Sequence, residues 1–218
     1  MTLAKRLKAM GQAKYQADGD PRTSGPGFKL TVHDETLDAP ASWSGSKVVF
    51  VNSMSDLFHD EVPLDFIRRV FGVIEATPQH TYQILTKRSR RLRSLASQLS
   101  WPPNLWMGVS IESQSYAFRA RHLAAVPAAV RFLSVEPMLG PVEPDLDGIG
   151  WVIVGGESGP RARPIEYEWV VALRDRCVGE DVPFFFKQWG GRTPKANGRM
   201  LDDRTWDDMP EGVLHLVG

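Results

Sequence analysis

The main pattern in the sequence is a short apolar run that ends in small polar residues and is followed by a helical pattern. The clearest example is Val48–Val51, which ends at Asn52 and precedes a helical pattern opening at Pro63. Continuous β-branched runs are typical of strands that are buried on both faces. The same pattern recurs further along the chain. We therefore predict strands at residues 48–53, 82–86, 105–109, 131–135, 151–154 and 183–187.

The spacing of these runs favours an α/β fold with mostly parallel strands. Strands that alternate with helices are joined by right-handed crossovers, and none here is followed by the glycine pattern of a dinucleotide site. We therefore expect a partial (β/α) barrel over residues 1–190 and a polar tail or short hairpin over 191–218, packed by Trp206 and Leu214. Residues 1–15 predict a helix with no strand before it, so the first strand of the barrel is expected to be missing.

Composition limits the kinds of partner. The chain of 218 residues carries 26 Lys and Arg against 26 Asp and Glu, so any basic surface must be local. We find neither a signal peptide nor an apolar run of membrane-spanning length, which predicts a cytoplasmic protein without a membrane partner. Cys177 is the only cysteine and lies in a helical pattern, so we interpret it as a small core residue.

Polar residues follow each predicted strand, and parallel strands bring such residues to one edge of the sheet, here called the mouth. We expect a ligand site there. Its candidate residues are Asn52, Ser53, Asp56, Thr86, Lys87, Arg88, Ser110, Glu112, Ser134, Glu136, Gly155, Gly156, Glu157, Lys187, Gln188 and Trp189.

The candidates combine carboxylates, cations and an aromatic ring. Converging carboxylates bind a metal, hold a ribose or ammonium group, or transfer protons, although each can also cap a helix or pair with a cation. Lys87 and Arg88 suit a phosphate or carboxylate, whereas Arg90, Arg91 and Arg93 are interpreted as a solvated face. Gln188 and Trp189 suit a nucleobase or nucleotide, and rim packing is an equal alternative for Trp189.

Six motifs together resemble one known family. They are Phe50–Phe58 (FVNSMSDLF), Gln83–Arg88 (QILTKR), Asn104–Ser110 (NLWMGVS), Ser134–Pro137 (SVEP), Gly155–Gly159 (GGESG) and Phe186–Gly190 (FKQWG). In this order they resemble the phage-associated three-Cys-motif family of unknown function, which is similar to radical S-adenosylmethionine (SAM) enzymes. The resemblance covers essentially the whole chain.

The resemblance implies a cofactor chemistry that this chain does not carry by itself. Family members place a cysteine-rich loop before a helix similar to Leu3–Leu7, and three such cysteines hold a [4Fe–4S] cluster whose fourth iron binds SAM. This sequence begins at Met1, after that point, and Cys177 alone cannot hold the cluster. The resemblance therefore implies an Fe–S enzyme that cleaves SAM if an upstream segment is present. Without that segment it implies a chain that has no cofactor and is inactive in that reaction.

Two alternatives stay open. One is a cluster-free barrel that binds a nucleotide, a nucleic acid or a partner protein. The other is a phosphate-handling hydrolase with a metal at Asp56, Glu112 and Glu136. In either case the missing strand predicts an open sheet edge and self-association.

Overall fold

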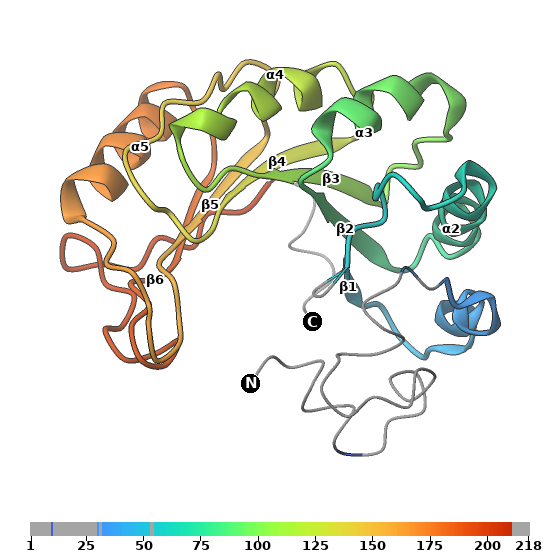
Figure 1. Cartoon of the computed structure of the whole chain (residues 1–218), viewed down its shortest axis with the longest axis horizontal. Helices are drawn as coiled ribbons and strands as arrows, with labels where there is room; N and C mark the ends of the chain where they lie inside the picture. Colours follow the sequence, from blue (N-terminus) through green and yellow to red (C-terminus); the bar gives the residue numbers. More distant parts are fainter. Residues whose placement is uncertain (1–9, 11–29, 31, 53–54, 211–218) are drawn as a thin grey trace.

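The computed structural model describes residues 10, 30, 32–52 and 55–210. It shows six strands in one sheet, all parallel and arranged in chain order from β1 to β6 (Figure 1). The sheet curls into a half-barrel, which confirms the predicted α/β partial barrel. The helix predicted over residues 1–15 falls almost wholly outside the described residues, as do Ser53 and Leu214.

The strand predictions are confirmed, with ends that differ by one or two residues. The strands are β1 Val48–Val51, β2 Thr81–Thr86, β3 Leu105–Ser110, β4 Val130–Val135, β5 Trp151–Gly155 and β6 Phe184–Gln188. Their apolar, β-branched runs suit this fold because both faces of most strands are covered by protein.

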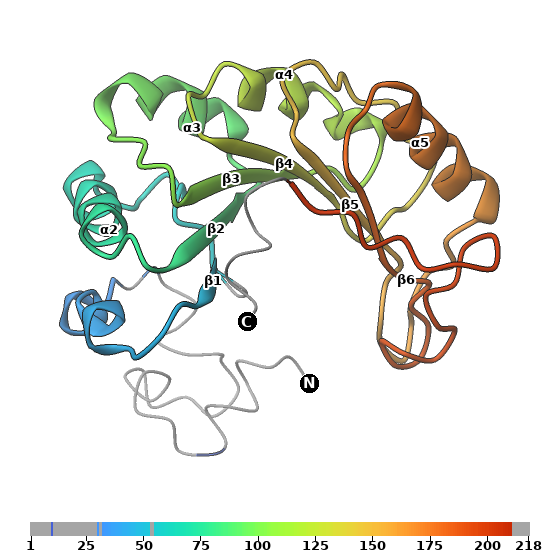
Figure 2. The ribbon, with the colours of Figure 1, turned by 180° about the vertical axis from the view of Figure 1, so that it is seen from behind.

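Helices line the convex side of the sheet (Figures 1 and 2). They are α2 Leu64–Ala76, α3 Ser89–Leu95, α4 Phe118–Ala124 and α5 Tyr167–Gly179. Short 3-10 turns are η2 Asp34–Thr36, η3 Ala39–Ser42, η4 Ala96–Gln98 and η5 Gln114–Tyr116. The connection from β4 to β5 contains no helix. None of the described helices has the length and apolar character needed to cross a bilayer.

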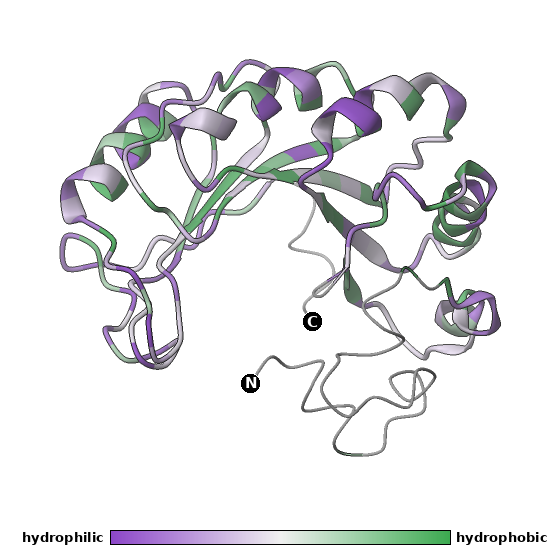
Figure 3. Ribbon diagram, viewed as in Figure 1, coloured by the Kyte–Doolittle hydropathy of each residue, from purple (hydrophilic) through white to green (hydrophobic). Residues whose placement is uncertain are grey.

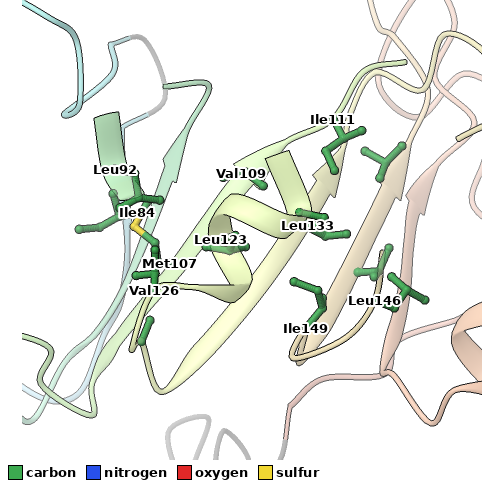
Figure 4. Packing of buried hydrophobic residues seen from close by; sticks show 14 of the residues in the cluster. Ile84, Leu92, Met107, Val109, Ile111, Leu123, Val126, Leu133, Leu146 and Ile149 are labelled. Carbon is green, nitrogen blue, oxygen red and sulfur yellow. The ribbon is translucent and has the colours of Figure 1, made fainter. Parts of the chain in front are cut away.

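The main core lies between the sheet and these helices. Ile84, Met107 and Leu133 project from successive strands toward Leu92 of α3 and Leu123 of α4, and all five side chains are inaccessible to solvent (Figure 4). Colouring by hydropathy shows the same separation, since the polar colour of the helices lies mainly on their outer sides (Figure 3). This layer is therefore formed by the apolar side chains on the inner face of each helix, which recur about every 3.6 residues, and by every second side chain of each strand.

The opposite, concave face carries an aromatic cluster. The strand register places Phe132 beside Trp151, and Trp106 and Phe185 lie on the same face. The ring centroids of Trp106 and Phe185 are each 6.0 Å from the ring centroid of Trp151. Gly108 makes room for this layer, because a Cβ atom there would lie 2.3 Å from the Phe132 ring. These rings fill the part of the concave face away from the mouth.

The two edges of the sheet differ. At β6, the Phe186 N–H donates to the carbonyl of Trp206 at 2.9 Å, and the Trp206 ring packs on Phe184. Among the described residues no segment pairs with the outer edge of β1, where Val48 and Phe50 are each 47% exposed. Within this part of the chain, β1 is therefore an open edge.

Candidate functional site

The carboxyl ends of the strands meet at the mouth, as expected for a parallel sheet. Register places Ser110 of β3 beside Ser134 of β4, and Val135 of β4 beside Val154 of β5. Glu112 and Glu136 each follow one of these serines by two residues, so both carboxylates lie just beyond neighbouring strands. Each of them is the centre of a separate ion-pair cluster.

The first cluster joins Lys87, Glu112 and Arg119. One carboxylate oxygen of Glu112 accepts a hydrogen bond from Lys87 Nζ, and the other accepts from Arg119 Nη1 at 3.1 Å. Arg119 Nη1 also donates to the Ser110 carbonyl at 2.7 Å, and its guanidinium lies 4.1 Å from the centre of the Tyr116 ring. Arg119 therefore positions the glutamate, while Lys87 is the solvent-facing member, with 52% of its side chain exposed.

Two opposing effects act on the pKa of Glu112. Burial raises the pKa, because a buried carboxylate is poorly solvated. The hydrogen bond and charge of Lys87 and the charge of Arg119 lower it and prevail, so the net shift is downward. Glu112 is thus held as a buried carboxylate between two cations.

The second cluster joins Glu136 and Lys187. Lys187 Nζ lies 3.1 Å from Glu136 Oε1, and the Ser134 hydroxyl donates to Glu136 Oε2 at 3.3 Å. Gly155 makes this geometry possible, because a Cβ atom at that position would lie 2.8 Å from Glu136 Oε1. The Lys187 side chain is 55% exposed, so its ammonium is also open to solvent.

The mouth therefore presents two carboxylates flanked by two accessible ammonium groups. In strand order the charges are positive at Lys87, negative at Glu112 and Glu136, and positive at Lys187. An ammonium has three donors, so each lysine can keep its glutamate and still donate to a ligand. This arrangement can hold a small molecule that carries both charges.

Asp56 supports the first cluster from the loop after β1. Its Oδ1 accepts from Thr86 Oγ1 at 2.6 Å and from the Phe58 N–H at 2.9 Å, and its Oδ2 accepts from the Lys87 N–H at 2.9 Å. The Thr86 hydroxyl oxygen in turn accepts from the Arg88 N–H at 2.9 Å. Asp56 and Thr86 thus fix the backbone at Lys87, whereas Asn52 lies exposed at the end of β1.

Glu157 is held apart from both clusters. Arg163 binds it in a bidentate manner through Nε at 2.7 Å and Nη2 at 2.9 Å, and the Arg163 N–H adds a bond of 2.9 Å. The side-chain and backbone hydrogen bonds of Arg163 lower the pKa of Glu157 to about 2. This pairing closes the turn between the two residues.

The glycine and aromatic candidates join two loops at the rim. A Cβ atom at Gly156 would lie 2.0 Å from the carbonyl oxygen of Trp189, so the close approach there is made by the chain itself. Gln188 Nε2 donates to Ser158 Oγ at 2.9 Å, and Trp189 Nε1 donates to the Met200 carbonyl at 2.8 Å. The Trp189 ring stacks on the Tyr167 ring, and the two ring centroids are 6.4 Å apart. These contacts hold the rim beside Lys187.

Sequence reasoning missed Arg119 and Arg163. Arg119 is buried although it is charged. Its position between Ala117 and Ala120, on the side of a short helix that faces the sheet, was the feature that could have predicted this burial. Arg163 had no usable signal, because the turn that returns it to Glu157 contains no regular element.

The described residues do not form a metal centre. No three His, Cys, Asp or Glu side chains among them come together in a way that could hold an ion, so a metal at Asp56, Glu112 and Glu136 has no support in this geometry. Cys177 is buried in α5, and burial raises the pKa of its thiol to about 12. A lone protonated thiol in the core does not fit an Fe–S cluster.

Comparison with known proteins gave one match. A family model described as "Protein of unknown function (DUF5131)" matches residues 1–210. Neither the curated proteins nor the solved structures gave a significant match to the chain.

Proposed function

The chain belongs to the DUF5131 family of proteins of unknown function, and we propose that its mouth binds a zwitterionic nucleoside of the S-adenosylmethionine class. The observation that carries this proposal is the order of charges across the mouth. Glu112 and Glu136 lie between the accessible ammonium groups of Lys87 and Lys187.

The amino-acid end of SAM matches this order. Its ammonium group is complementary in charge to the two carboxylates, and its carboxylate is complementary to either lysine. Glu136 has capacity for such a contact, since its Oε2 accepts one bond, of 3.3 Å, from Ser134. Glu112 is more fully occupied, so in this proposal it orients Lys87 and shapes the local charge, while Glu136 meets the ligand.

The resemblance to radical SAM enzymes and the half-barrel fold support a ligand of this class. The cluster chemistry of those enzymes is a different matter, because it requires three thiolates and this chain has Cys177 alone. The proposal for these residues is therefore binding and orientation of the nucleoside, and no redox step is assigned to them.

Isothermal titration calorimetry of the full chain with SAM tests the proposal. Glu136→Gln should weaken binding by about ten- to a hundredfold, since a charge-assisted hydrogen bond contributes about 1.5–3 kcal/mol. Glu180→Gln is the matched control, because Glu180 pairs with Arg176 at the end of α5, before β6 begins. It should bind as the wild type does.

Two results would contradict the proposal: no SAM binding by the wild type, or equal affinity in Glu136→Gln. A parallel titration with ADP separates the alternative of a plain nucleotide. ADP has phosphates but no ammonium, so tighter binding of ADP than of SAM would favour that alternative.

A further inference from the structure

Arginine side chains gather on the outer side of α3 and α4. These two helices pack against each other on the convex side of the half-barrel (Figures 1 and 2). Arg88 immediately precedes α3, Arg90 and Arg93 lie on α3, and Arg121 lies on α4, and all four side chains are exposed. We call these four residues the arginine surface.

Within the described residues, the arginine surface lacks ion-paired carboxylates. None of its four members forms an ion pair with an Asp or Glu in the part of the chain that the structure describes. The neighbouring helix differs, because on α2 Arg68 pairs with Asp65 at 3.0 Å and Arg69 pairs with Asp34 at 2.7 Å. Exposed arginines on this side of the molecule can thus form ion pairs, but within the described residues none of the four members of the arginine surface does so.

Contacts across the helix pair hold these charges close together. The Arg90 guanidinium lies 5.6 Å from the centre of the Phe118 ring on α4, and Ser89 Oγ lies 3.0 Å from His122 Nδ1. Burial lowers the pKa of His122, and the positive charges of Arg93, Arg90 and Arg121 lower it further. The contacts between α3 and α4 thus bring arginines of both helices near one imidazole.

We propose that the arginine surface binds the phosphodiester backbone of a nucleic acid. Guanidinium groups bind phosphate in a bidentate manner, and neither α3 nor α4 contains a lysine. Unpaired like charges repel one another, and a polyanion removes that repulsion while releasing its own counterions. Because the whole chain has zero net charge, attraction to a polyanion must come from local basic surfaces such as this one.

The position of the surface also suits a long, continuous ligand. It lies on the outer side of the half-barrel, where a duplex or single strand meets no enclosing wall. The binding does not depend on the nucleoside site in the mouth, so the two proposals can fail separately. The interpretation of Arg90 and Arg93 as a merely solvated face is the alternative to be tested.

Fluorescence anisotropy with a short labelled duplex DNA and with a labelled single strand provides the test. Four phosphate contacts predict a log–log salt slope of roughly −3 to −4 for duplex DNA. The double variant Arg90→Gln with Arg93→Gln should lower the affinity at least about tenfold and reduce the salt slope to about half of the wild-type value. The matched control is Arg68→Gln/Arg69→Gln, which removes the same charge from paired arginines on α2 and should leave both quantities nearly unchanged.

Circular dichroism and SAM titration of the same variants show whether fold and mouth are intact. The proposal is overturned if the wild type binds neither DNA at low salt, or if the α2 variant loses as much affinity as the α3 variant. Equal binding of labelled polyglutamate would also overturn it, because the surface would then recognise acidic chains rather than phosphodiesters.

Discussion

Lys187 at the end of β6 reaches over β5 to Glu136 beyond β4, with Nζ and Oε1 3.1 Å apart. The strand between them ends at Gly155, where any side chain would meet the glutamate. A glycine in the middle strand thus allows charges from two non-adjacent strands to pair.

Gly155→Ala should disturb this pair without removing a charge. The added Cβ would lie 2.8 Å from Glu136 Oε1, so the carboxylate must move away from Lys187. We expect SAM affinity to fall at least about tenfold, the loss typical of one displaced charged hydrogen bond. Calorimetry measures this change, and Gly72→Ala is the control because nothing lies within 4 Å of a Cβ atom at that position of α2. Undiminished affinity in Gly155→Ala would remove Glu136 from the site.

The Glu112 cluster should make stability depend on pH. The pKa of Glu112 is lower in the folded chain than in the unfolded chain, so its contribution is fully present above the unfolded value. The contribution is lost as the pH falls through the folded pKa. Urea unfolding at pH 7 and at pH 3 should therefore show a smaller loss of stability for Glu112→Gln than for the wild type. An identical loss in both proteins would show that the ion pairs with Lys87 and Arg119 contribute no net stability.

Asp56→Ala should destabilise the chain more than an ordinary surface substitution. It removes the acceptor for Thr86 Oγ1 and for the N–H groups of Phe58 and Lys87. Thr86 is buried, and leaving a buried donor such as its hydroxyl without a partner costs about 1–3 kcal/mol. Denaturant titration measures this loss, with Asp60→Ala at an exposed position of the same loop as the control. Equal midpoints for the two variants would rule out the anchoring role.

The outer edge of β1, which no described segment pairs with, should promote self-association. Val48 and Phe50 are each 47% exposed, and exposed apolar edge strands pair readily with other chains. Sedimentation velocity over a range of concentrations should show species larger than the monomer, and Phe50→Lys should reduce them. A wild type that stays monomeric throughout would count against association through this edge.

The sequence predicts the strands well because each apolar run is continuous and ends sharply, as at Val51 and Asn52. The sequence cannot show which of the three glutamates is available to a ligand, since Glu112, Glu136 and Glu157 occupy similar places after their strands. Their roles depend on partners that local patterns do not reveal. Glu157 meets Arg163 through an irregular turn, whereas Glu136 meets Lys187 because of strand order. Ion pairs that depend on the tertiary structure cannot be predicted from the periodic pattern of apolar residues.

The aromatic layer on the concave face escaped prediction for a similar reason. Trp106, Phe132 and Trp151 each read as one apolar residue in a buried strand. The contacts among these rings depend on the register of the strands. The need for a glycine at position 108 becomes clear only once the Phe132 ring is seen to occupy the space beside it.

The order of the strands also bears on how the chain reaches its fold. Each strand pairs with the one before it in the sequence, from Val48 with Thr81 to Val152 with Phe184. Neighbours in the sheet are therefore also neighbours along the chain, which makes the entropy of loop closure smaller than it would be for strands far apart in the sequence. During synthesis each strand emerges after the partner it needs, so the sheet can grow in one direction as the polypeptide leaves the ribosome.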